Sequence, residues 1–167
     1  MEHKTSILFF CLILLIFPLA GCRSKSLISE YKSKEHGFSF LCPKSFKETS
    51  KEENRFALLD KEDNAILFII ENDPKETDIL SLGKEQAYKD FSEEFSDEEI
   101  EELVRTIRTE KGRWYTYAID FPEKSVKSIV SGTLCRGKEI SIVLVTKDRD
   151  YGKNKDYYTG IISSFEC

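Results

Sequence analysis

Cysteines and histidines are the residues of this chain whose chemistry is most distinctive. The 167 residues include two histidines, His3 and His36, and five cysteines: Cys11, Cys22, Cys42, Cys135 and Cys167. Thiols form disulfides and thioethers, and with imidazoles they bind transition metals. No two cysteines have the close spacing of a zinc site, so we expect no metal site.

Cys22 ends a segment that predicts lipid attachment. Residues 7–20 carry no charge, and this run is shorter than the roughly 20 residues that span a bilayer but suits a signal peptide. The following Leu19-Ala20-Gly21-Cys22 resembles the lipobox of bacterial lipoproteins. That resemblance implies removal of residues 1–21 as a signal peptide and attachment of fatty acyl chains, such as palmitate, to Cys22. The alternative is an uncleaved anchor with an incidental cysteine.

If Cys22 is lipidated, the protein is expected to be bound to a membrane. Each buried methylene contributes about 0.8 kcal/mol, so two or three acyl chains would hold the protein permanently on the extracytoplasmic side of the membrane. Arg23 follows Cys22, where an aspartate commonly marks inner-membrane retention in bacteria with two membranes. We therefore expect the outer membrane if the bacterium has two membranes.

Removal of the signal peptide leaves few groups for catalysis. It takes away His3, one acid and one base, so the net charge stays at -5 and His36 is the remaining histidine. An acidic chain offers no broad basic surface, so we expect no nucleic-acid partner. Gly-x-Ser-x-Gly and phosphate-binding glycine loops do not occur in the sequence. We expect no cofactor and no enzyme, although the residues leave carboxylate-based catalysis open.

The hydrophobic pattern predicts a single α+β domain. Residues 22–35 are polar and are interpreted as a lipidated tether, and residues 36–167 form the domain. The predicted order is three strands, a helix, four strands and a helix: 37–42, 55–60, 65–71, 81–95, 102–109, 114–121, 126–135, 139–146 and 155–165. Short connections predict an antiparallel sheet flanked by helices. A capping-box pattern at Ser96 and Glu99 competes with the strand predicted over 102–109.

Several of these residues resemble PsbP-like domains. The resemblance covers residues 36–167 and rests on Gly37-Phe-Ser-Phe-Leu-Cys-Pro43, Phe46, Gly112-Arg-Trp-Tyr-Thr-Tyr, Gly137-Lys-Glu-Ile and Ile162-Ser-Ser-Phe165. The group includes an extrinsic photosystem protein, a Ran-binding import factor and bacterial envelope proteins of the DcrB type. It implies an α-β-α sandwich that serves as a docking or binding module. It implies no particular ligand, because the members bind unrelated partners.

Three cysteines remain as candidates for a disulfide in an oxidising compartment. Cys42, Cys135 and Cys167 allow three pairings, and each pairing leaves one thiol free. We predict Cys42–Cys167, because a strand end and a chain end can both adjust to disulfide geometry. Cys135 would then be a small buried apolar residue.

Two charged segments are candidate binding surfaces. Residues 147–158 are expected to form a loop that contacts a glycan or protein, or that simply connects two elements, and its candidate residues are Lys147, Arg149, Tyr151, Lys153 and Lys155. The acids over residues 93–102 could bind calcium or a basic partner, but they lack the spacing of an EF-hand and are interpreted as a solvated helix end.

Together these features predict a lipid-anchored envelope protein that docks onto an unknown envelope or extracellular protein. The alternative is an envelope lipoprotein that binds a small ligand, a glycan or calcium.

Overall fold

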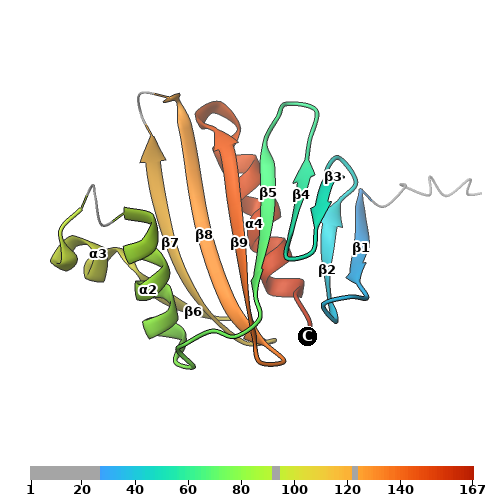
Figure 1. The fold of residues 1–167 in the computed structure, drawn as a ribbon. Helices are drawn as coiled ribbons and strands as arrows, with labels where there is room; N and C mark the ends of the chain where they lie inside the picture. Colours follow the sequence, from blue (N-terminus) through green and yellow to red (C-terminus); the bar gives the residue numbers. More distant parts are fainter. Residues whose placement is uncertain (1–26, 92–94, 122–123) are drawn as a thin grey trace, which may run out of the picture.

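The computed structural model describes residues 27–91, 95–121 and 124–167, which form one α+β domain (Figure 1). The predicted fold class is confirmed. In chain order the elements are β1 Ile28–Ser33, β2 Phe38–Pro43, β3 Lys47–Glu52, β4 Arg55–Leu59, β5 Ala65–Glu71, α2 Ile79–Phe91, α3 Asp97–Leu103, β6 Arg105–Arg108, β7 Arg113–Phe121, β8 Val126–Cys135, β9 Lys138–Lys147 and α4 Tyr151–Ser164.

The strands form a seven-stranded antiparallel sheet and a separate β1–β2 hairpin. The order in the large sheet is β3-β4-β5-β9-β8-β7-β6, so β9 pairs with β5 on one side and with β8 on the other. The β8–β9 turn places Arg136 and Gly137 at φ 54° and 79°, the left-handed conformation that two-residue hairpin turns require. β9 therefore joins the strands of the first half of the chain, β3 to β5, to those of the second half, β6 to β8.

One face of the sheet is covered by α4 and the β1–β2 hairpin. This side of the core is rich in stacked rings: the Phe56 and Phe68 centroids lie 4.3 Å apart, and those of Phe40 and Phe68 lie 4.8 Å apart. Because β2 contributes Phe38 and Phe40 to this core, the hairpin is an integral part of the domain.

The other face is covered by α2, which packs on β6, β7 and β8 (Figure 1). Tyr115 is buried between Gly83 of α2 and Gly132 of β8, and a Cβ atom at either glycine would collide with the tyrosine side chain. These two glycines allow the helix and the sheet to approach closely around one large ring. The same face remains open over β9, β5 and β4 in Figure 1.

Several predicted boundaries differ from the structure. The segment predicted as a tether through residue 35 contains β1, because Tyr31 and Ser33 face β2 and the core. The helix predicted from Ser81 begins at Ile79, since the Asp78 carboxylate accepts the Ser81 amide at 3.0 Å and caps the helix. Both interpretations of residues 96–109 were partly right: Ser96 and Glu99 form a capping box for α3, and the strand β6 is shorter than predicted.

Candidate functional site

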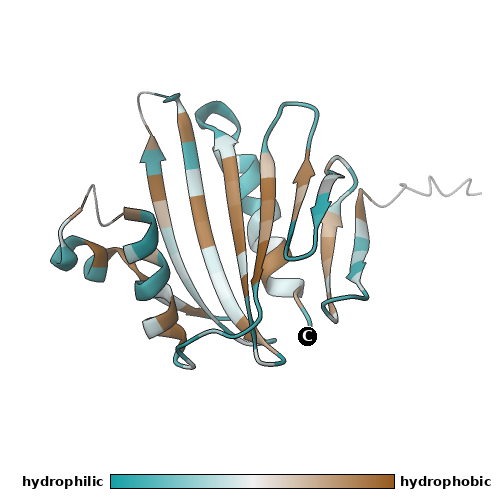
Figure 2. Cartoon of the chain, viewed as in Figure 1, coloured by the Kyte–Doolittle hydropathy of each residue, from teal (hydrophilic) through white to brown (hydrophobic). Residues whose placement is uncertain are grey.

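An apolar trough lies beside α2 on the open face of the sheet. Its floor is formed by half-buried apolar side chains of β5, β7 and β9, namely Leu67, Ile69, Ile119, Phe121, Val143 and Val145. The hollow measures about 440 Å³, and Figure 2 shows apolar colouring along β5, β8 and β9. Within the described residues, no further element covers this floor.

The strands of the trough are apolar on both faces. In β5 the alternate residues Ile66, Phe68 and Ile70 are buried against the α4 side, while Leu67 and Ile69 are only half-buried on the trough side. The nearly continuous apolar sequence of residues 140–145 is typical of a strand that is covered on both faces. On the trough side this strand is covered only in part, since Val143 and Val145 are half-buried. The trough is therefore a surface on which a ligand or partner could bind.

The α2 wall of the trough carries polar groups. The Asp90 carboxylate accepts the Tyr117 hydroxyl at 2.7 Å and the Gln86 amide nitrogen at 2.9 Å. Burial, followed by the bond to Asp90, raises the pKa of Tyr117, so the phenol stays protonated and continues to donate. The wall therefore presents an exposed carboxylate, and the hydrogen bonds from Tyr117 and Gln86 fix its position.

A buried acid lies deeper beneath the same helix. Glu139 is 5% exposed, and its Oε1 accepts the Tyr115 hydroxyl at 2.7 Å and the Ser141 hydroxyl at 3.3 Å. Burial raises the pKa of Glu139, and the carboxylate of Glu71 on the neighbouring strand acts in the same direction. Since the carboxylate is enclosed and both partners are on strands, this cluster links β7 to β9 within the sheet.

The predicted binding loop over residues 147–158 is not a loop. Asp148–Asp150 form a 3-10 turn, and α4 begins at Tyr151. Buried Asn154 explains the difference, because its amide donates to the Thr146 hydroxyl at 2.9 Å and fixes this polar turn of helix on β9.

The candidate side chains of that segment contact neighbouring parts of the fold. Lys147 donates to the Glu62 carbonyl at 2.6 Å, and Arg149 lies 2.9 Å from the Glu62 carboxylate. The ammonium groups of Lys155 and Lys153 lie 5.9 Å from the Tyr151 ring and 5.7 Å from the Tyr157 ring. The candidate residues are thus distributed over the end of β9, a turn and a helix, and none of them lines the trough.

The cysteine pairing also differs from the prediction. Cys135 and Cys167 form the disulfide, with Cα atoms 5.5 Å apart, and Cys42 is free and buried. The predicted Cys42–Cys167 pair is wrong because Glu166 pairs with Ser39 in a β-bridge. The bridge places Glu166 beside Ser39, which is three residues before Cys42 in β2. Cys167 therefore lies near Cys135 at the end of β8. Burial raises the pKa of the Cys42 thiol to about 11.

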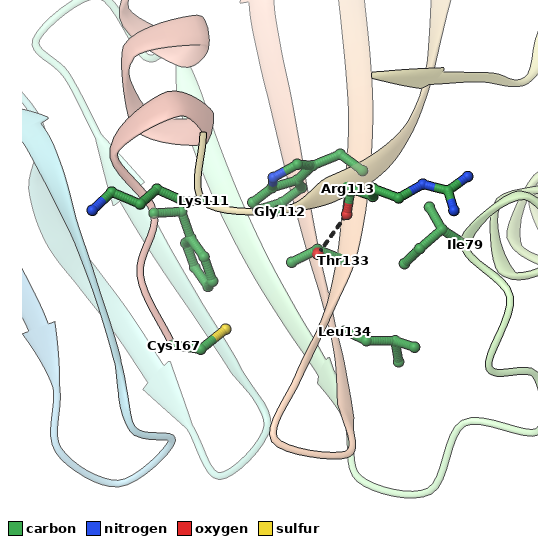
Figure 3. A pocket seen from close by; sticks show the side chains of 9 residues that line it. Ile79, Lys111, Gly112, Arg113, Thr133, Leu134 and Cys167 are labelled. Atoms are coloured by element: carbon green, nitrogen blue, oxygen red, sulfur yellow. Dashed lines mark hydrogen bonds between the residues drawn. The ribbon is translucent and has the colours of Figure 1, made fainter. Parts of the chain in front are cut away.

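A second hollow of about 300 Å³ lies beside Cys167 (Figure 3). In this view the Thr133 hydroxyl donates to the Arg113 carbonyl at 2.8 Å. Lys111, at the rim, pairs with Glu166 at 2.5 Å. These polar groups bond to each other or to Glu166, and they hold the chain end against β7 and β8. This hollow is therefore a weaker candidate than the trough.

The remaining sequence candidates do not form a reactive site. His36 is buried, and its ring stacks on Phe38 with the centroids 6.2 Å apart. Among the described residues, no group of three or more His, Cys, Asp or Glu side chains could hold a metal ion. No helix in this part of the chain is long and apolar enough to cross a membrane. Leu19, Ala20, Gly21 and Cys22 lie outside the described residues.

Solved structures with the same fold come from distant organisms. Cyanobacterial PsbP from Synechocystis sp. PCC 6803 matches with a TM-score of 0.60 and 19% identity, over 87% of this chain and 95% of its own. A Bacteroides thetaiotaomicron protein matches with a TM-score of 0.60 and 11% identity, over 84% of this chain and 48% of its own. The Saccharomyces cerevisiae Ran-binding protein Mog1p matches with a TM-score of 0.56 and 8% identity, over 83% of this chain and 94% of its own.

The sequence agrees with this structural likeness. No curated protein matches the sequence as a relative, but the family model described as PsbP matches residues 26–167. That range includes every strand and helix described above. This chain therefore belongs to the PsbP family.

Proposed function

We propose that this chain is a lipid-anchored cell-envelope protein of the DcrB type whose PsbP domain docks a protein partner in the trough. The observation that carries the proposal is the half-buried aliphatic floor on β5 and β9, beside the wall formed by α2. Covering such a floor removes apolar surface from water and contributes about 25 cal/mol per Å² covered. The lipobox sequence at Leu19–Cys22 supports the anchor.

The dimensions of the open face favour an amphipathic helix as the docked element. Neighbouring strands lie about 4.8 Å apart, so β9, β5 and β4 together present a width of about 10 Å. A helix has a diameter of about 10 Å with side chains and packs 8–10 Å from a neighbouring helix. One partner helix laid beside α2 would complete the helical layer, with its apolar side on Ile69 and Val143.

The polar groups of α2 would face one side of the docked partner helix. Asp90 is exposed, and its carboxylate is held by Tyr117 and Gln86. A basic or hydrogen-bond-donating side chain on the α2 side of the partner helix would match it. Mog1p is described as a Ran-binding protein, and this example of protein binding on the same fold supports a docking role without indicating the partner.

Photo-crosslinking in cells tests the docking site. A photoreactive residue at Ile69 is expected to form protein adducts, and the additional substitution Val143→Asp is expected to abolish them because it places a charge on the same floor. Ile107, a 40%-exposed residue on β6 outside the trough, is the matched control position. Equal adduct formation at positions 69 and 107, or adducts that survive Val143→Asp, would contradict docking in the trough.

The anchor is tested separately. Mass spectrometry of the mature amino-terminal peptide should find acyl chains on Cys22, and Cys22→Ser should move the protein from the membrane to the soluble fraction. An unmodified Cys22 in a membrane-bound protein would contradict lipidation.

A further inference from the structure

We propose that the outer side of the β1–β2 hairpin is a second interaction surface, which lies against the lipid bilayer and orients the domain. This inference rests on the proposed lipid anchor at Cys22. It concerns a surface formed by Ile28 and Leu41, called the hairpin patch, with exposed Leu27 at its end, and not the trough.

The hairpin patch consists of large apolar side chains that the fold leaves exposed. Leu27, Ile28 and Leu41 are 81%, 49% and 48% exposed. Phe40 and Cys42 point into the core, so Leu41 between them points outward, as successive side chains of a strand alternate. Ile28 pairs with Pro43, and Glu30 pairs with Leu41, which puts Ile28 and Leu41 diagonally across the hairpin and within reach of each other.

Leu27 lies directly before β1, at the same end of the hairpin as Ile28. Its carbonyl accepts the Lys44 amide at 2.8 Å, so the residue nearest to the anchor continues along the edge of the hairpin. The patch thus lies at the part of the domain where the chain arrives from Cys22.

The length of the connection restricts how the domain can turn. Five residue steps separate Cys22 from Leu27, and a fully extended chain of that length reaches at most about 18 Å. A domain of this size has a radius of gyration of about 14 Å and is thus roughly twice as wide as the connection is long. The anchored domain therefore keeps its β1 end close to the bilayer.

Basic side chains accompany the hairpin patch. Lys44 and Lys47 are exposed, and Lys153 lies over the ring of Tyr157, which packs edge-on against Phe46 at 6.5 Å. Exposed apolar side chains with a lysine, Lys44, at the same end of the hairpin suit the interface of a membrane with anionic lipids.

The acids near the hairpin have partners within the domain, and Glu166, which lines a hollow with Leu41, pairs with Lys111 at 2.5 Å. Glu30 pairs with Lys32 at 3.1 Å, and Glu48 accepts the Tyr31 hydroxyl at 2.7 Å. Their charges are thus partly compensated within the domain, and the basic rim stays available to the bilayer surface.

The test uses full-length lipidated protein in vesicles that contain anionic phospholipid. Leu41→Cys is labelled with a fluorophore that reports the polarity of its surroundings. Cys42 is buried and its raised pKa keeps the thiol protonated, and Cys135 and Cys167 are oxidised, so the new cysteine is the reactive one. Ile107→Cys is the matched control, because Ile107 is an exposed aliphatic residue on β6, at the far edge of the large sheet.

The label at position 41 is expected to shift its emission to the blue and to be quenched by nitroxide-bearing lipids, whereas the label at position 107 is not. Adding Ile28→Asp should reduce both effects at position 41, because Ile28 lies diagonally across the hairpin from Leu41. The emission of Trp114, a buried residue, checks that each variant is folded.

Equal behaviour of the two labels in protein that floats with the vesicles would overturn the hairpin patch and leave the anchor intact. Protein that does not float would overturn the anchor, and the orientation proposal with it. Flotation thus separates the two failures before any fluorescence is measured.

Discussion

Loss of the Cys135–Cys167 disulfide should produce a large and calculable loss of stability. The bond joins residues 32 positions apart, and closing a loop of that length removes about 12 cal/mol/K of chain entropy from the unfolded state, or about 3.7 kcal/mol at 25 °C. Cys167 is exposed at the chain end, so Cys167→Ser removes the bond without opening a cavity. We therefore expect the free energy of unfolding to fall by about 3–4 kcal/mol.

Urea unfolding followed by tryptophan fluorescence measures this change. Trp114 lies edge-on to Phe165, two residues before Cys167, with the ring centroids 5.2 Å apart. With a denaturant slope of about 2 kcal/mol/M, the midpoint should fall by about 2 M. Reductant should shift the wild-type midpoint by the same amount and leave Cys167→Ser unchanged.

Cys42→Ala is the control, because Cys42 is a free buried thiol. Its loss should cost only about 1 kcal/mol, and this variant should keep the full response to reductant. A wild-type midpoint that does not respond to reductant, or a response that persists in Cys167→Ser, would refute the reasoning.

Three further changes test the interior. Gly132→Ala should destabilise the domain by about 1–3 kcal/mol in thermal unfolding, because the new methyl group overlaps the Tyr115 ring. Glu139 has a raised pKa in the folded state, so folding retains its proton, and wild-type stability should fall as pH rises from the usual glutamate range through the folded pKa. Glu139→Gln should remove this fall and be more stable than wild type at neutral pH, as urea unfolding at several pH values would show. Asn64→Ala should cost about 1–3 kcal/mol in urea unfolding, because the Asn64 carbonyl accepts the Thr146 hydroxyl at 2.9 Å and the Lys147 amide at 3.0 Å.

The strands that the sequence predicted are those with strong apolar patterns, and the ones it missed are polar. β3, Lys47–Glu52, is an edge strand made entirely of charged and hydroxyl residues, a composition that protects a sheet edge from further pairing. β1 pairs only with β2, and all its side chains are exposed except half-buried Tyr31 and buried Ser33. Neither segment carries the alternation that identifies a half-buried strand.

The candidate site was predictable in part. The nearly continuous apolar run at 140–145 is typical of a strand with two apolar faces, and the trough is where one of these faces stays open. Its location depends on β5 and β9 being neighbours, with Ile70 opposite Ile140, and local patterns do not reveal such a distant pairing. The disulfide was mispredicted for the same reason, because the Ser39–Glu166 bridge positions Cys167.

The late central strand has a consequence for biogenesis. β9 ends at Lys147 and is the strand that joins β5 to β8. A nascent chain that ends before residue 138 would hold two incomplete sheets, each with an unpaired apolar edge. Pairings between distant residues form slowly, so the domain should reach its native state only when almost the whole chain has been made. Such a polypeptide stays without its native fold until β9 has been made.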